Sequence, residues 1–330
     1  MPFCDVGMEH AGNGNGIRIY YRTYGYGRGT TKVLLINGLA GTHKGWEPQV
    51  KGLTGFPDKD FDFDRDFDFD GDEGIEVCCF DNRGMGMSSV PTKISEYTTT
   101  AMANDSLALL DHLGWKKTHV IGHSMGGMIA CKLASMAPDR LSSLALLSTT
   151  SGGYECLPKI DFQMISIAFR LLIAKTPEQR AMLDLETRYT KKYLDEYVEG
   201  STITRKEILL DKHVKKIISN SEMQSSYGFK GQVHACWMHR MTPNDLHVIR
   251  SAGFSIQIIH GRYDIVVQVR HARNLAGKLK PVATMVEFDG GHLVGHERPY
   301  EVNRSLLELI KISESKSTDN SESGKLVIKI

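Results

Sequence analysis

The chain has 330 residues, 41% of them hydrophobic, and a formal net charge of +1 at pH 7. This size suits one large hydrophobic core, and the near-neutral charge excludes the strongly basic surface of a nucleic-acid-binding protein. No run of eighteen apolar residues could form a membrane span, and the N-terminus lacks the pattern of a secretory signal, so we expect a cytoplasmic protein with its six scattered cysteines reduced.

Strands and helices alternate along the first half of the chain. Apolar periodicity predicts strands at 17–25, 33–36, 75–80, 117–121 and 144–148, and helices at 46–53, 101–113 and 128–137. The glycine-rich turn after residue 25 indicates an antiparallel hairpin between the first two strands. The later βα alternation is typical of an α/β fold with a mostly parallel sheet. Asp105, on the second helix, is expected to be solvated or to cap the helix.

An unusual acidic segment interrupts this pattern. Aspartate occupies every even position from 58 to 72 and alternates with phenylalanine. Charge repulsion favours an exposed loop over a strand. The residues Asp66, Asp68, Asp70 and Gly71 match the opening of an EF-hand calcium loop, but Val77 stands where the last acidic ligand belongs. We therefore predict no metal site and no cofactor.

A small-x-Ser-x-small sequence, Gly122–Gly126, connects the strand ending at 121 to the helix starting at 128. This sharp turn exposes the central serine hydroxyl and leaves room only for small residues two positions on either side. Ser124 is therefore the candidate nucleophile.

A serine nucleophile needs a histidine base and a carboxylate that orients this base. A predicted strand at 254–259 runs into a glycine turn that carries Asp264 just beyond the strand end. Another short strand, 283–288, is followed by a glycine-rich loop that ends in His292. We predict Asp264 as the acid and His292 as the base, because the chain order Ser, Asp, His is that of an α/β-hydrolase sheet.

Four ordered motifs make the chain resemble the α/β-hydrolase fold superfamily, in particular its esterase-like and haloperoxidase-like branches. They are residues 33–41, 77–89 and 260–264, together with Gly290–His292, alongside the serine turn, and the resemblance covers residues 17–312. It implies a mostly parallel eight-stranded sheet flanked by helices, with a helical cap inserted after strand 6. The first motif departs from the common His-Gly pattern by having Asn37 before its glycine.

The resemblance also implies an oxyanion hole made of two backbone N–H groups. They would be the amide of Met125, at a helix N-terminus, and the amide of Leu39, in the loop after the strand 33–36.

The predicted organisation divides the chain into four parts. These are a first core segment 1–150 with the acidic insert 56–74, a helical cap 151–250, a second core segment 251–312 and a disordered tail 313–330, in which Ser, Glu and Lys leave no apolar face. Helical periodicity within the cap covers 161–174, 178–198, 205–218 and 230–240. Six of its side chains could face the pocket: Met164, Phe169, Tyr227, Phe229, Trp237 and Met238.

These features predict a serine hydrolase that cleaves a small or medium carboxylic ester through an acyl-enzyme, with the cap excluding water. The expected partner is a small-molecule ester, with no nucleic acid, and the sequence does not indicate whether the protein has protein partners. An epoxide hydrolase or haloalkane dehalogenase would need a carboxylate at position 124. A carbon–carbon bond hydrolase, a lyase, a perhydrolase or a small-molecule receptor on the same fold stays open as an alternative.

Overall fold

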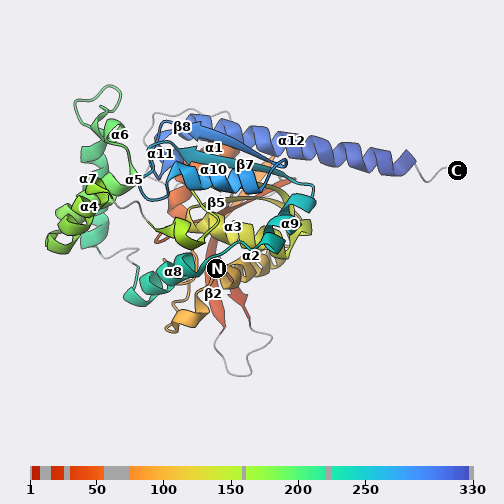
Figure 1. The fold of residues 1–330 in the computed structure, drawn as a ribbon, viewed down its shortest axis with the longest axis horizontal. Helices are drawn as coiled ribbons and strands as arrows, with labels where there is room; N and C mark the ends of the chain where they lie inside the picture. Colours follow the sequence, from red (N-terminus) through yellow and green to blue (C-terminus); the bar gives the residue numbers. More distant parts are fainter. Residues whose placement is uncertain are drawn as a thin grey trace.

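The computed structural model describes residues 2–7, 16–25, 30–55, 74–157, 161–219 and 224–326. An eight-stranded sheet lies between helices on both of its faces (Figure 1). The strands are β1 Phe3–Val6, β2 Ile17–Tyr24, β3 Thr31–Ile36, β4 Ile75–Phe80, β5 Thr118–His123, β6 Leu141–Leu147, β7 Ser255–Gly261 and β8 Ala283–Phe288. Their order in the sheet is β1-β2-β4-β3-β5-β6-β7-β8, which confirms the predicted α/β-hydrolase fold.

The first strands of the sheet pair differently from the sequence prediction. β2 is antiparallel to β4, with Tyr21 opposite Phe80, and β1, which the periodicity missed, is antiparallel to β2. All later pairs are parallel. The predicted hairpin between β2 and β3 is therefore wrong, because β3 has β4 on one side and β5 on the other.

Apolar side chains alternate between the two faces of the central strands. Leu34 and Ile36 belong to one buried cluster, and Val33 and Leu35 belong to another. The first cluster also contains residues of the helices α2 Thr99–His112, α3 Met125–Met136, α8 Ser226–Met238, α9 Pro243–Ser251 and α10 Val269–Lys278. The second contains residues of α1 Glu47–Thr54, α11 Val294–Glu297 and α12 Pro299–Leu326. Both faces of the sheet are thus covered, as a parallel sheet requires.

Four helices between β6 and β7 pack apart from the sheet, at the left of Figure 1. They are α4 Phe162–Ile173, α5 Pro177–Arg188, α6 Lys191–Asp195 and α7 Arg205–Ile218, and two small buried clusters of their own hold them. In contrast, Ala235 of α8 and Ile249 of α9 join the main core cluster. The part of the predicted cap region that packs separately is therefore shorter than 151–250.

The C-terminal segment differs from the predicted disorder, since α12 continues to Leu326 (Figure 1). Its first part is anchored by buried Val302, Leu306 and Ile310. Once a helix is nucleated, adding polar residues costs little free energy, which explains the extension into the Ser-rich sequence.

Two further predictions concern membrane-spanning helices and the state of the cysteines. Within the described ranges, no helix has the length and apolar character needed to cross a bilayer. All six cysteines are free thiols.

Residues 56–73, including the candidate calcium loop, lie outside the described residues, but Val77 is in strand β4, where an EF-hand would require a helix.

Candidate active site

Ser124 lies in the turn between β5 and α3, with the strained backbone angles φ 53° and ψ −118°. A Cβ atom at Gly122 would come within 2.3 Å of the carbonyl oxygen of Gly126. A Cβ atom at Gly126 would come within 2.0 Å of the carbonyl oxygen of Ile36. The two glycines therefore have the steric reason that the sequence predicted, and the tight turn presents the serine side chain above the ends of the strands.

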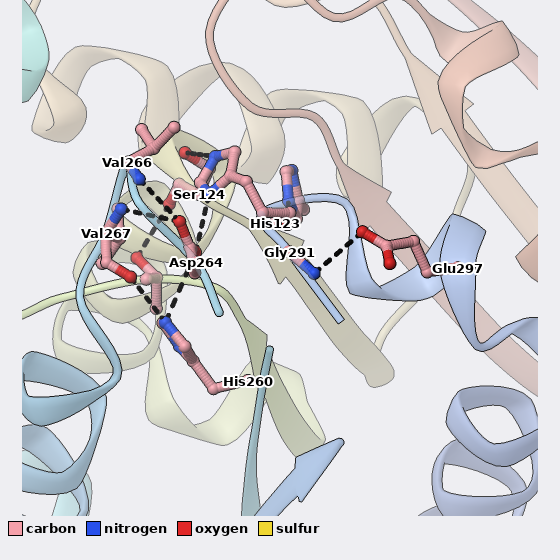
Figure 2. Close-up of polar contacts among 10 residues, drawn as sticks. His123, Ser124, His260, Asp264, Val266, Val267, Gly291 and Glu297 are labelled. Carbon is pink, nitrogen blue, oxygen red and sulfur yellow. Dashed lines mark hydrogen bonds and ion pairs between the residues drawn. The ribbon is translucent and has the colours of Figure 1, made fainter. Parts of the chain in front are cut away.

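The structure brings the three predicted residues together although they are up to 168 positions apart in sequence. His292 Nε2 lies 3.1 Å from Ser124 Oγ, and His292 Nδ1 lies 2.8 Å from Asp264 Oδ2. A carboxylate can only accept, so Nδ1 carries a hydrogen and Nε2 of the neutral ring is free to accept the serine proton. Figure 2 shows Ser124 and Asp264 in this cluster.

Asp264 is held by more than His292. Its Oδ1 accepts the N–H groups of Val266 at 2.8 Å and Val267 at 2.9 Å, and buried His260 lies 3.4 Å from Oδ2 (Figure 2). Burial acts to raise the pKa of Asp264, but the electrostatic interaction with His292 and the contact with His260 outweigh burial and hold this pKa well below its ordinary value. The carboxylate therefore stays ionised and fixed in orientation.

His123, next to the serine, positions the backbone of His292. Its Nε2 donates to the carbonyl oxygen of His292 at 3.0 Å, and the two rings lie 4.9 Å apart. Burial and the neighbouring His292 lower the pKa of His123 to about 3. A neutral ring with its proton on Nε2 satisfies this contact.

The loop after β3 is fastened on two sides. Asn37, where the family pattern has histidine, donates to the carbonyl oxygen of Phe80 at 3.1 Å. The amide of Ala40 donates to Gln232 on α8 at 3.0 Å. Leu39 lies between these anchors and lines the same cavity as Ser124.

Met125 is the first residue of α3, and its side chain is buried in the main core cluster. No hydrogen bond in the described part of the chain uses the amide of Leu39 or of Met125.

The loop that carries His292 is clamped by Glu297, which sequence reasoning missed. Glu297 is buried, and it accepts the N–H of Gly291 at 2.8 Å, the N–H of Thr190 at 2.9 Å and the Thr190 hydroxyl at 2.6 Å. Figure 2 shows the bond to Gly291. Because Thr190 is the N-cap residue of α6, this carboxylate links the separately packed helices to the residue that precedes His292.

Further contacts strengthen this link. The amide of Leu293 donates to the carbonyl oxygen of Arg188 at 3.0 Å. His296 Nε2 donates to the carbonyl oxygen of Gly45 at 2.8 Å, and its Nδ1 lies 3.2 Å from the Tyr189 hydroxyl. Burial lowers the pKa of His296, so the neutral ring donates at one nitrogen and accepts at the other. His296 is thus structural and also lines the cavity.

A cavity of about 790 Å³ lies over Ser124 and His292, a size suited to a small-molecule ligand. Apolar residues of the core and of α8 form part of its lining: Leu39, Met128, Leu147, Phe229, Val233 and Trp237. Helices α5 and α7 supply another part of the lining, which is mostly polar or charged: Asp184, Thr187, Arg188, Arg205, Leu209, Lys212, His213 and Lys216.

Two of the six side chains predicted to face the pocket line this cavity, Phe229 and Trp237. Met164 instead packs in the small cluster of α4 and α5. Phe169, Tyr227 and Met238 are all more than half exposed. Helical periodicity did not show which face of each helix would meet the core, so it could not separate these outcomes.

The family model for the alpha/beta hydrolase fold matches residues 31–299 of this chain. The match covers the sheet from β3 onward, the turn at Ser124 and the loop of His292. The chain therefore belongs to the alpha/beta hydrolase family.

Relatives of known name differ in their reactions. The chain is 34% identical over 131 residues to the putative carbamate hydrolase RutD of Caulobacter segnis, a match that covers 39% of this chain and 42% of the relative. It is 23% identical over 286 residues to bifunctional epoxide hydrolase 2 of Sus scrofa, covering 78% of this chain and 50% of the relative. In both matches, the chain spans half or less of the relative's length.

A solved esterase from Thermogutta terrifontis superposes with a TM-score of 0.67 at 19% identity, covering 95% of this chain and 99% of that one. At this identity the likeness concerns the fold alone.

Proposed function

We propose that this protein is a serine hydrolase that cleaves a small or medium carboxylic ester through an acyl-enzyme. The observation that carries the proposal is the pair of contacts of His292, at 3.1 Å to Ser124 Oγ and 2.8 Å to Asp264 Oδ2. A serine hydroxyl is a weak nucleophile at neutral pH, and this arrangement is the one that activates it.

The proposed cycle assigns each group one task. His292 Nε2 takes the proton of Ser124 as Oγ bonds to the ester carbonyl carbon, and Asp264 stabilises the imidazolium. The amides of Leu39 and Met125 donate to the oxyanion, and His292 then returns the proton to the leaving alcohol. Water, activated by His292, attacks the acyl-enzyme and restores Ser124.

Two features besides the triad support acyl transfer. The amides of Leu39 and Met125 carry no hydrogen bond in the described residues, and Met125 begins a helix, where developing negative charge is favoured. The helices α5, α6 and α7 line the cavity, and they would exclude bulk water during the reaction as a cap.

Carbamate hydrolysis is a second candidate, favoured by the relative named as a putative carbamate hydrolase. A carbamate presents the same kind of carbonyl carbon, so it could use the same nucleophile and base. Epoxide hydrolysis is not proposed, because Ser124 stands where a carboxylate nucleophile would be needed.

The test is a panel of p-nitrophenyl esters of increasing acyl length, with p-nitrophenyl N-alkyl carbamates alongside, and labelling by a fluorophosphonate probe. Ser124→Ala should abolish both turnover and labelling. Ser135→Ala, a serine on α3 that bonds to the carbonyl oxygen of Lys132, is the matched control and should retain both.

Turnover or labelling that persists in Ser124→Ala would contradict the proposal. Tight binding of a small molecule to wild type without turnover of any panel member would favour a receptor.

A further inference from the structure

His260 is a buried histidine to which the proposed cycle assigns no role. It is the penultimate residue of β7 and is fully shielded from solvent. Its Nε2 lies 2.8 Å from the carbonyl oxygen of Val267 and 3.4 Å from Asp264 Oδ2 (Figure 2). His260 is not among the described residues that line the cavity over Ser124. Any effect of this histidine on the reaction is therefore transmitted through other residues.

The neighbours of Nε2 fix the tautomer of His260. A carbonyl oxygen and a carboxylate oxygen can only accept, so Nε2 carries the hydrogen. Nδ1, in contrast, is buried and has no hydrogen-bond partner within the described ranges. The hydrogen-bonding capacity of the ring is thus used at Nε2, on the side of Val267 and Asp264.

These contacts close the loop that carries the proposed acid. Asp264 Oδ1 accepts the N–H groups of Val266 and Val267, and the carbonyl oxygen of Val267 accepts the N–H of His260. Both polar groups of the Val267 backbone are therefore bonded, one to the carboxylate and one to β7. Since Oδ1 is occupied by the two amides, Oδ2 is the oxygen that contacts His292. His260 thus fastens the loop from the side of the strand, next to this oxygen.

The same ring stabilises the charge of Asp264. Burial acts to raise the pKa of Asp264, and the contacts with His292 and His260 hold it low. An ionised carboxylate in a fixed orientation keeps the proposed base in the tautomer that accepts the serine proton. The contacts of His260 therefore support both the orientation and the charge on which this tautomer depends.

We infer that His260 is a positioning residue for the proposed reaction: by holding the Val267 carbonyl and lying against Oδ2 of Asp264, it fixes the carboxylate in the orientation that His292 needs. This inference rests on the proposed function. A displacement of about 1 Å in a catalytic group can cost about 100-fold in rate. A buried donor that prevents this displacement contributes to kcat without touching the substrate.

The test replaces His260 with leucine, which keeps a branch at Cγ but has no donor. We expect kcat on a p-nitrophenyl ester, expressed per folded enzyme and with Tm measured on the same preparation, to fall by about 10- to 100-fold. His260→Gln should retain most of the activity, because its amide N–H can reach the place of Nε2. His260→Asn, whose shorter amide reaches only the place of Nδ1, should lose activity as the leucine variant does.

Two comparisons separate positioning from a general loss of structure. In an Asp264→Asn background, His260→Leu should lower kcat by less than about threefold, because the carboxylate through which His260 acts is already absent. His119→Leu is the matched control. His119 is buried at the opposite end of β5 from Ser124, and its Nδ1 lies 2.8 Å from Ser143 Oγ. This variant loses a buried histidine and its contact away from the proposed site, so it should keep the kcat of wild type.

A wild-type kcat in His260→Leu, or equal losses in the Gln and Leu variants, would overturn the inference. Losses that multiply when His260→Leu and Asp264→Asn are combined would also overturn it. If leucine prevents folding, His260→Asn is compared with His260→Gln, and equal activity of these two overturns the inference. Ser124→Ala is assayed alongside: when its activity is abolished, these outcomes concern the inference alone. Activity of Ser124→Ala equal to that of wild type would instead refute the proposed function, and the inference with it.

Discussion

Replacing Glu297 with alanine tests whether the link between the cap helices and the His292 loop supports catalysis. The change removes three hydrogen bonds at once, those from Gly291 N–H, Thr190 N–H and the Thr190 hydroxyl. Hydrogen bonds to a charged acceptor contribute about 1.5–3 kcal/mol each. Burial offsets part of this gain, since it raises the pKa of Glu297. We therefore expect Glu297→Ala to lower the free energy of unfolding by about 2–4 kcal/mol.

The same change should also slow the reaction. Gly291 directly precedes His292, and a displacement of about 1 Å in a catalytic group can cost about 100-fold in rate. We expect kcat on a p-nitrophenyl ester to fall by about 10- to 100-fold, with KM changed much less, because Glu297 does not line the cavity. Urea unfolding and steady-state kinetics on the same preparation measure the two effects.

Glu297→Gln is the control, because glutamine keeps an oxygen that accepts both N–H groups and adds an amide that can donate to Thr190. It should retain most of the stability and of kcat. The raised pKa adds a pH dependence: the protonated carboxyl is favoured in the fold, so its contribution is full at low pH and is lost as pH rises through the raised folded pKa. The stability of Gln relative to Glu should therefore increase over that range. A wild-type-like kcat in Glu297→Ala, or equal damage by Gln and Ala, would refute this reasoning.

Three further changes test other parts of the site and core. Asp264→Asn should lower kcat by about 10³- to 10⁴-fold at nearly unchanged Tm, because an amide can stabilise the wrong imidazole tautomer; a loss below tenfold would contradict its role. Gly126→Ala places a Cβ 2.0 Å from a backbone oxygen of β3 and should destabilise the fold by about 3 kcal/mol or more, as measured by urea unfolding. The control Gly277→Ala has open space around its Cβ, so it should be neutral or stabilising by up to about 1 kcal/mol in the same assay. Asp105→Asn leaves the guanidinium of Arg83 buried without its bidentate partner and should cost about 3–5 kcal/mol; a cost under about 1 kcal/mol would show that the pair is dispensable.

Local steric rules explain why the residues at the centre of the candidate site could be predicted from the sequence. The turn at Ser124 accepts only small residues at 122 and 126, so the glycines mark it. Asp264 and His292 follow strands at the same edge of a parallel sheet, and their chain order was enough to bring them into one hypothesis. Parallel strands with both faces buried also leave continuous apolar runs, which explains why the later strands were found.

Interactions over long sequence distances were the ones that could not be predicted. Asp105 was expected to be solvated or to cap its helix, but it is buried and paired with Arg83, which approaches from a loop 22 residues away. A carboxylate on a helix gives no sign of such a partner. The β2–β4 pairing was missed for the same reason, because sequence shows which segments are strands and not which strands are neighbours.

The loop of His292 and Glu297 depends both on a local steric rule and on a contact between residues far apart in sequence. Glu297 accepts a hydrogen bond from Thr190, which lies 107 positions earlier at the start of a cap helix. A Cβ at Gly291 would meet Glu297 Oε1 at 2.9 Å and the carbonyl oxygen of Arg188 at 2.9 Å, so the close approach of cap and loop requires glycine there. Since Arg188 also lines the cavity, the segment that would contact a bound ligand is continuous with the segment that fixes the loop of His292. Substrate contacts under the cap and the position of the proposed base are therefore mechanically connected, and a ligand that orders this segment should also order His292.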